Sequence, residues 1–159
     1  MTTGVTWHEF ELAAPELAEP IRGQFERHLH HVLATLRLDG APRVSGNEAR
    51  FHGDHLWLGM MPGSRKRADL LRDPRFALHA APIDTELAVG DAKVSGTAHE
   101  VDDLDAVREY LAAIGSTFEP EEASMFVARI DSAVLTRVAG QEMIVESWSP
   151  TRGLSTDRR

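Results

Sequence analysis

The stretch HVLATLRLDGAPRVSGNEARFHGDHLWLGMM, from His31 to Met61, decides the fold of this chain. It contains three strand-like apolar runs separated by two turn pairs with glycine: Val32–Leu38, Asp39-Gly40, Pro42–His52, Gly53-Asp54 and His55–Met61. Such turn pairs join neighbouring strands into antiparallel hairpins. Two hairpins in succession therefore predict an antiparallel meander.

Further strands follow the meander towards the C-terminus. We predict them at Arg75–Ala81, Ala92–Val101, Met125–Ile130, Ala133–Val138 and Glu142–Trp148. The proline, glycine and acidic residues of Pro82–Asp91 are typical of a loop. Because strands dominate and form hairpins, the sequence predicts an α+β fold, an antiparallel barrel with helices packed outside.

Three helices are expected around these strands. The first runs from Pro15 to about Leu29, where apolar residues recur every four positions. The second follows Ser64 as N-cap, turns Leu70 and Leu71 inward, and stops at Asp73-Pro74. The third spans Asp103–Ile114 and ends at Gly115, and its predicted apolar face consists of Leu104, Val107, Leu111 and Ile114.

Composition narrows the classes of protein. A chain of 159 residues fits one domain, which we expect over residues 1–159 with a core at about 15–148 and a C-terminal tail at 149–159. The net charge of −8 argues against a nucleic-acid or anionic-membrane binder. The lack of cysteine excludes disulfides and thiolate chemistry. With no signal peptide or spanning segment visible, we expect a cytoplasmic location.

The segment Gly63–Pro74 carries the clearest functional signal. Three cations, Arg65, Lys66 and Arg67, stand in the first turn of the second helix. The helix dipole already makes that end positive, so each cation there is unfavourable by roughly 0.3–1 kcal/mol. A bound phosphate, held by backbone N–H groups, the Ser64 hydroxyl and the basic side chains, explains the cluster. The alternative is a solvated surface turn, partly compensated by Asp69.

Other chemical signatures are weak or absent. Eight histidines occur, but none completes a recognised metal-binding spacing, so no metal site is expected. The glycines form neither a Walker-type phosphate loop nor a dinucleotide-binding motif, and no serine stands on a hydrolase elbow. Trp7, Trp57 and Trp148 are interpreted as core or interface anchors. No side chain is identified as a general acid or base, so the catalytic residues stay unknown.

Read as one unit, His31–Leu78 resembles the flavin-binding split-barrel family that includes pyridoxamine 5′-phosphate oxidase. The matching pieces stand in the family's order: "HVLATLRLDG", "APRVSGNEARFHG", "HLWLGM" and "GSRKRADLLRDPRFALH". The later "AKVSGTAHEV" resembles the family's next strand. The resemblance implies a split β-barrel with flanking helices, an FMN cofactor, a homodimer and oxidoreductase activity on a small-molecule substrate.

The resemblance also implies a set of cofactor contacts. Arg65 and Lys66 would hold the terminal phosphate of the flavin, with Ser64 nearby. The second strand would run along the isoalloxazine ring, with Gly46 allowing a close backbone approach. Val44, Ser45 and Asn47 would also lie beside the ring. Arg43 would position the cofactor or is simply solvated. Met60 and Met61 would contact the flavin or belong to the core.

The C-terminal segment Trp148–Arg158 departs from the oxidase pattern, because it keeps Arg152 but lacks the family's substrate histidine. Oxidation of pyridoxamine phosphate is therefore not expected. Three functions stay open: an FMN-dependent oxidoreductase with an unknown substrate and electron donor, a deazaflavin-dependent reductase, and a non-catalytic flavin-binding protein. The tail is expected either to fold over the partner's flavin or to be disordered.

Overall fold

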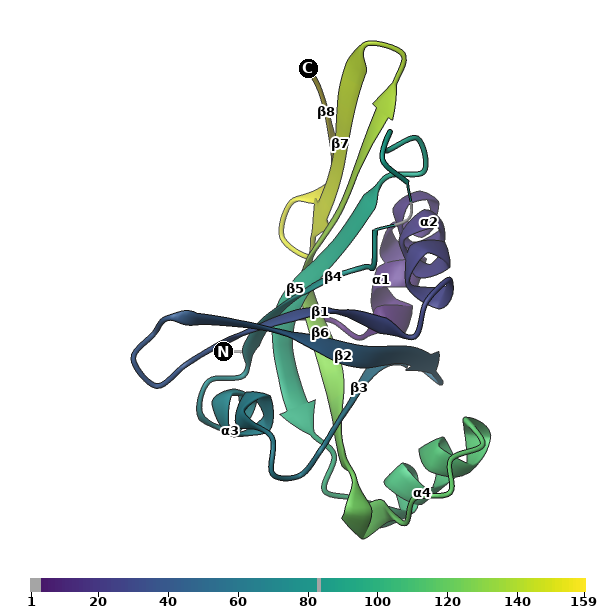
Figure 1. The fold of residues 1–159 in the computed structure, drawn as a ribbon. Helices are drawn as coiled ribbons and strands as arrows, with labels where there is room; N and C mark the ends of the chain where they lie inside the picture. Colours follow the sequence, from purple (N-terminus) through teal and green to yellow (C-terminus); the bar gives the residue numbers. More distant parts are fainter. Residues whose placement is uncertain (1–3, 83) are drawn as a thin grey trace.

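The fold is known from a computed structural model, which describes residues 4–82 and 84–159. These residues form an eight-stranded antiparallel sheet of order β3-β2-β1-β4-β5-β6-β7-β8, in which β3 also pairs with β6. This extra pairing closes β1 to β6 into a barrel and leaves β7 and β8 outside it. The predicted antiparallel split barrel with flanking helices is confirmed (Figure 1).

The predicted meander forms the first half of the barrel. Its strands are β1 (His30–Leu36), β2 (Pro42–His52) and β3 (His55–Met60). Both predicted turns are present, and their glycines, Gly40 and Gly53, have φ values of +82° and +55°. Such values favour glycine because a side chain is strained there. Turn chemistry thus fixed this part of the fold.

The second half of the barrel contains β4 (Arg75–His79), β5 (Asp91–Glu100) and β6 (Ser124–Ala139). The sequence predicted two strands where β6 is continuous. The predicted break is a β-bulge at Asp131, since Ser95 pairs with Ser132 while Gly96 pairs with Ile130. A Cβ atom on Gly96 would lie only 1.9 Å from the Arg129 carbonyl oxygen, so the two strands approach closely at the bulge.

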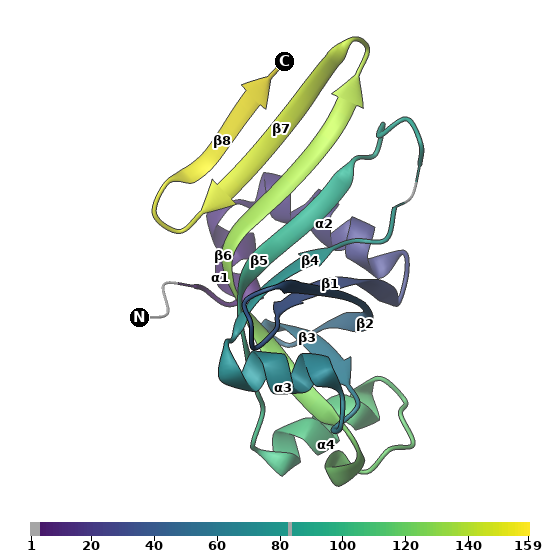
Figure 2. The same cartoon turned by 60° about the vertical axis from the view of Figure 1, so that its left-hand side comes forward.

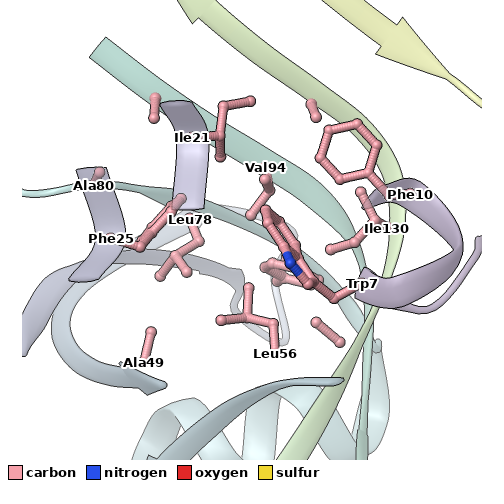
Figure 3. Close-up of a cluster of buried hydrophobic side chains, with 14 of the residues drawn as sticks. Trp7, Phe10, Ile21, Phe25, Ala49, Leu56, Leu78, Ala80, Val94 and Ile130 are labelled. Carbon is pink, nitrogen blue, oxygen red and sulfur yellow. The ribbon is translucent and has the colours of Figure 1, made fainter. Parts of the chain in front are cut away.

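Two helices cover one side of the barrel and fill its core. They are α1 (Trp7–Ala13), which the sequence did not predict, and α2 (Pro15–Glu26), which ends before the expected Leu29. Trp7 and Phe10 from α1 meet Ile21 and Phe25 from α2 over the inner face of the sheet (Figure 3). Burial of a large apolar side chain contributes about 1.5–3 kcal/mol, so this cluster holds the helices on the barrel.

The other two helices lie at the opposite end of the molecule from β8 (Figure 1, Figure 2). They are α3 (Arg65–Arg72) and α4 (Leu104–Ala113), followed by the short helix η1 (Pro120–Glu122). Two predicted inward residues point to solvent instead: Leu71 is 53% exposed and Leu104 is 45% exposed. On α3 the buried neighbour of Leu70 is Asp69, which has polar partners inside the barrel.

The C-terminal segment is a strand, β8 (Gly153–Arg158), rather than a disordered tail. It pairs with β7 (Glu142–Ser149) from Ile144 to Ser149, and the hairpin projects beyond the barrel (Figure 2). All three tryptophans are buried, as expected. Among the described residues, no helix has the length and apolar character needed to cross a membrane.

Candidate cofactor site

The basic turn at the start of α3 separates its three cations. Ser64 is the N-cap, as predicted, and its Oγ accepts a hydrogen bond from the Arg67 backbone N–H. The Arg67 guanidinium makes a bidentate pair with Glu100 at 2.7 and 3.0 Å. The Lys66 ammonium donates to the Gly46 carbonyl oxygen at 2.7 Å, while Arg65 is exposed. Arg65 and Lys66 are therefore available to an anion, and Arg67 is committed to Glu100.

Burial changes the titration of this turn. Desolvation lowers the pKa of the Lys66 ammonium, and the nearby Glu48 carboxylate opposes that change. The pKa of Arg67 is raised by its hydrogen bonds to Glu100. An anion beside Lys66 would favour the charged ammonium. The turn thus carries one desolvated cation, Lys66, and one exposed cation, Arg65.

Asp69 lies on the buried side of α3 and does not compensate Arg65 at the surface. Its Oδ2 accepts hydrogen bonds from Thr35 Oγ1 at 2.8 Å and from Arg43 Nε at 2.6 Å, and its Oδ1 accepts from Arg72 at 3.2 Å. Burial acts to raise the pKa of Asp69, but these hydrogen bonds outweigh it and hold the pKa below its usual value. Arg43 is therefore neither solvated nor free; it fixes α3 to β2.

Strand alternation divides the predicted contacts of β2 between two faces. Val44 and Gly46 lie on the outer face, where Val44 is 67% exposed and no atom stands within 4 Å of a Cβ built on Gly46. Asn47 is buried on the inner face, and its Oδ1 has no hydrogen-bond partner. Ser45, two residues before Asn47, lies on the same inner face of β2, and its Oγ atom is also buried without a hydrogen-bond partner.

A cavity of about 490 Å³ opens on the outer side of β2 and β3, beneath the C-terminal end of α4. Five predicted residues line it: Gly46, Asn47, Met60, Met61 and Lys66. Met60 belongs to the buried core, whereas Met61 is 69% exposed. The structure places Arg43, Val44, Ser45, Ser64 and Arg65 outside this lining.

The cavity is also lined by residues that the sequence did not indicate as cofactor contacts. Glu48 and Arg50 follow Gly46 on the outer face of β2, and Leu111, Ile114 and Phe118 come from α4 and the loop after it. Alternate residues of a strand face the same side of the sheet, so the position of Gly46 could have predicted that Glu48 and Arg50 share its face. No local signal could have placed α4 here, because its contact with β3 is long-range.

The described histidines do not form a metal centre. No group of three or more metal-ligating side chains occurs in residues 4–82 and 84–159. His31 is buried, its Nε2 lies 3.0 Å from the Phe25 carbonyl oxygen, and its Nδ1 accepts from the Ala81 backbone N–H at 2.9 Å. These contacts require a neutral ring, and burial lowers the pKa of His31 accordingly. His31 is a structural link between β1 and the segment after β4.

Comparisons with known proteins agree with this fold. The family model described as pyridoxamine 5′-phosphate oxidase matches residues 17–142. None of the curated proteins compared with the chain matches it. The chain resembles PhzG from Burkholderia lata, solved with tetrahydrophenazine-1-carboxylic acid, with a TM-score of 0.65, 13% identity, and coverage of 96% of this chain and 92% of PhzG.

Two further solved structures share the fold. A heme-binding protein from Mycobacterium smegmatis has a TM-score of 0.61 and 24% identity, and the match covers 82% of this chain and 57% of that protein. An F420 reductase has a TM-score of 0.52 and 20% identity, with coverage of 69% and 91%. At these identities the likeness shows the fold alone.

Proposed function

Because this chain belongs to the pyridoxamine 5′-phosphate oxidase family, we propose that it binds FMN and acts as an oxidoreductase on a small-molecule substrate. A single observation carries the proposal. Lys66, in the first turn of α3, donates a hydrogen bond of 2.7 Å to the Gly46 carbonyl oxygen of β2. The proposed phosphate site and the proposed surface for the ring would thereby be contiguous.

The residues at the start of α3 suit a phosphate monoester. The first backbone N–H groups of a helix have no partner within the helix, and the positive end of the dipole faces the same way. Arg65 and Lys66 add two side chains that can make charge-assisted hydrogen bonds. Ser64 orders the turn by capping it. The buried network at Asp69 holds the whole turn against β1 and β2.

The outer face of β2 suits the flavin ring. Gly46 presents bare backbone, because a Cβ at this position would meet nothing within 4 Å. Val44, two residues earlier on the same face of β2, and Met61, directly after β3, have exposed apolar side chains. When bound, the flavin would supply the hydride chemistry. The protein binds the phosphate, orients the ring along β2 and limits its access to water.

We further propose that two copies of this chain assemble as a homodimer. The outer faces of β1, β4, β5 and β6 share a groove of about 310 Å³ with an apolar lining that includes Val32, Ala34, Ala77 and Val134. Val32 is 41% exposed, and its neighbour across the β1–β2 ladder is Gly46. A second copy seated on this groove would cover the apolar surface and border the flavin.

A deazaflavin-dependent reductase is the second candidate. Its support is the F420 reductase among the structures that share this fold, together with a basic turn that suits the phosphate of either coenzyme. A non-catalytic flavin-binding protein is the third, since the sequence identifies no general acid or base. Oxidation of pyridoxamine phosphate is not proposed, because the C-terminal segment lacks the expected histidine.

The decisive experiment compares ligands that differ only in the phosphate. The purified protein is titrated with FMN and with riboflavin, and binding is followed by flavin fluorescence. We expect FMN to bind at least about 10-fold more tightly, because one charge-assisted hydrogen bond is worth roughly 1.5–3 kcal/mol. Equal affinities would contradict the phosphate site. Turnover of the loaded protein with an electron donor separates an enzyme from a flavin carrier.

A further inference from the structure

Arg50 lies on the cavity wall but takes no part in the proposed flavin site. It stands on the same outer face of β2 as Gly46, four residues or about 13 Å further along the strand. Together with Ile114, it also lines a second cavity of about 470 Å³; both residues line the first cavity as well. Arg50 therefore borders two cavities, next to the end of α4.

The Nε atom of Arg50 is fully buried and has no hydrogen-bond partner. Every other half-buried arginine in the described chain has its Nε bonded to a carboxylate or a carbonyl oxygen: Arg22, Arg43, Arg67, Arg129 and Arg137. A guanidinium stays charged at any physiological pH. A buried and unsatisfied donor is costly, so Arg50 is the half-buried arginine of the described residues whose Nε lacks a partner.

Among the described residues, no hydrogen bond joins the Arg50 side chain to an acceptor of this chain. Glu48, the acidic residue on the same face of β2, lies 3.7 Å from His30 Nε2 and is 46% exposed. At the end of α4, the carbonyl oxygens of Leu111 and Ala112 accept from the backbone N–H groups of Ser116 and Gly115. Arg50 is therefore not used as a cap for this helix. Because the Nε atom is closed to solvent, an acceptor from outside the chain would meet the terminal N–H groups of Arg50.

The wall next to Arg50 is apolar. Leu111 and Ile114 from α4, Phe118 from the following loop and Met125 from β6 line the same cavity. Phe118 is 59% exposed, so it stands at an open edge. A ligand that fits this space has an apolar body against α4 and an anionic group at Arg50. A carboxylate matches the planar guanidinium, because it can accept two parallel hydrogen bonds.

We infer that Arg50 recognises the carboxylate of an apolar, carboxylate-bearing substrate that occupies the α4 side of the cavity. The inference rests on the proposed function, which assigns the Lys66 side of the cavity to the flavin. It adds the substrate class and the residue that selects it. Arg50 contacts the substrate and leaves the flavin phosphate to the α3 turn.

The test uses naphthoate and its neutral isostere naphthamide as probes, with binding measured by calorimetry on the FMN-loaded and the FMN-free protein. We expect the wild type to prefer naphthoate by about 10- to 150-fold. Arg50→Gln should abolish this preference. Arg50→Lys keeps the charge but not the two parallel N–H donors of the guanidinium, so it should retain part of the preference. Arg108→Gln, on an exposed arginine of α4, is the matched control and should keep the full preference.

Three outcomes would overturn the inference. The first is equal affinity of the wild type for both probes, which includes weak or absent binding of naphthoate. The second is an unchanged preference for naphthoate in Arg50→Gln. The third is a loss of FMN affinity in Arg50→Gln, which would assign Arg50 to the flavin. If Arg50→Gln does not fold, thermal unfolding of the wild type decides, because only naphthoate should raise its Tm. Failure of the proposed function appears separately, as a wild type that does not bind FMN.

Discussion

The Nε atom of Arg43 donates a hydrogen bond of 2.6 Å to Oδ2 of Asp69, whose side chain is only 4% exposed. This pair connects β2, which carries one wall of the proposed cofactor site, to α3, which carries the basic turn. Thr35 on β1 donates to the same oxygen. The position of the basic turn relative to β2 therefore depends on one buried carboxylate.

Asp69→Asn should destabilise the protein, because it leaves Arg43 and Arg72 beside a neutral group. Breaking a buried ion pair costs about 3–5 kcal/mol, which corresponds to a fall in Tm of about 6–20 °C for a chain of this size. Thermal unfolding measures the change. Asp157→Asn removes an exposed pair with Arg159 and should shift Tm by no more than a degree or two; similar shifts for both variants would contradict the role of Asp69.

Arg65→Ala and Lys66→Ala should each weaken FMN binding by about 10- to 150-fold, because each removes a charge-assisted hydrogen bond to the phosphate. Neither variant should weaken riboflavin binding to the same degree. Fluorescence titration of both ligands measures the effect, with Arg108→Ala as the matched control. FMN affinity that does not change in the first two variants would rule out the α3 turn as the phosphate site.

Val32→Asp should dissociate the proposed homodimer, because a carboxylate in the apolar groove would be buried without a partner. Sedimentation at micromolar concentration should give twice the chain mass of 17.6 kDa for the wild type and the single mass for the variant. Leu12→Asp is the control, since Leu12 is 71% exposed on α1, outside the groove. A wild type that sediments as a monomer would refute the assembly.

The free energy of unfolding should fall with pH below about 6.5, the ordinary pKa of histidine. Burial lowers the pKa of His31 in the folded state, so the unfolded chain binds the extra proton first and stability decreases as pH falls. One proton contributes at most about 1.4 kcal/mol per pH unit. In His31→Asn, urea unfolding between pH 7 and pH 5 should show a smaller slope, whereas the exposed His99→Asn should retain the wild-type slope.

Tyr110, the sole tyrosine of the chain, should titrate far above its ordinary pKa. It stacks on Trp57 with ring centroids 4.3 Å apart and an interplanar angle of 4°, and burial raises its pKa to about 12, although Arg50 opposes the rise. Ultraviolet absorbance of tyrosinate follows this group alone. A midpoint near 10 in the folded protein would show that α4 does not cover Tyr110 as described.

Local patterns were sufficient for the meander and for most of the helix boundaries. The turn pairs Asp39-Gly40 and Gly53-Asp54 predicted both hairpins, and Ser64 caps α3 as its side chain predicts. The errors occur where tertiary contacts override a local preference. The sequence predicted a break between two strands at residues 131–132, where the structure has a β-bulge at Asp131. The polar segment after Ser149 pairs with β7.

By itself, the sequence determined the antiparallel barrel and the basic turn at Ser64, Arg65 and Lys66, because turns, caps and alternation depend on neighbouring residues. The family resemblance, also carried by the sequence, implied the split form of the barrel. The tertiary structure alone decided which charges are free. It buries Asp69 against Arg43, pairs Arg67 with Glu100, and leaves Arg50 next to the end of α4 without a partner for its Nε. These relationships join elements distant in the chain, and only packing selects among many possible charge pairs.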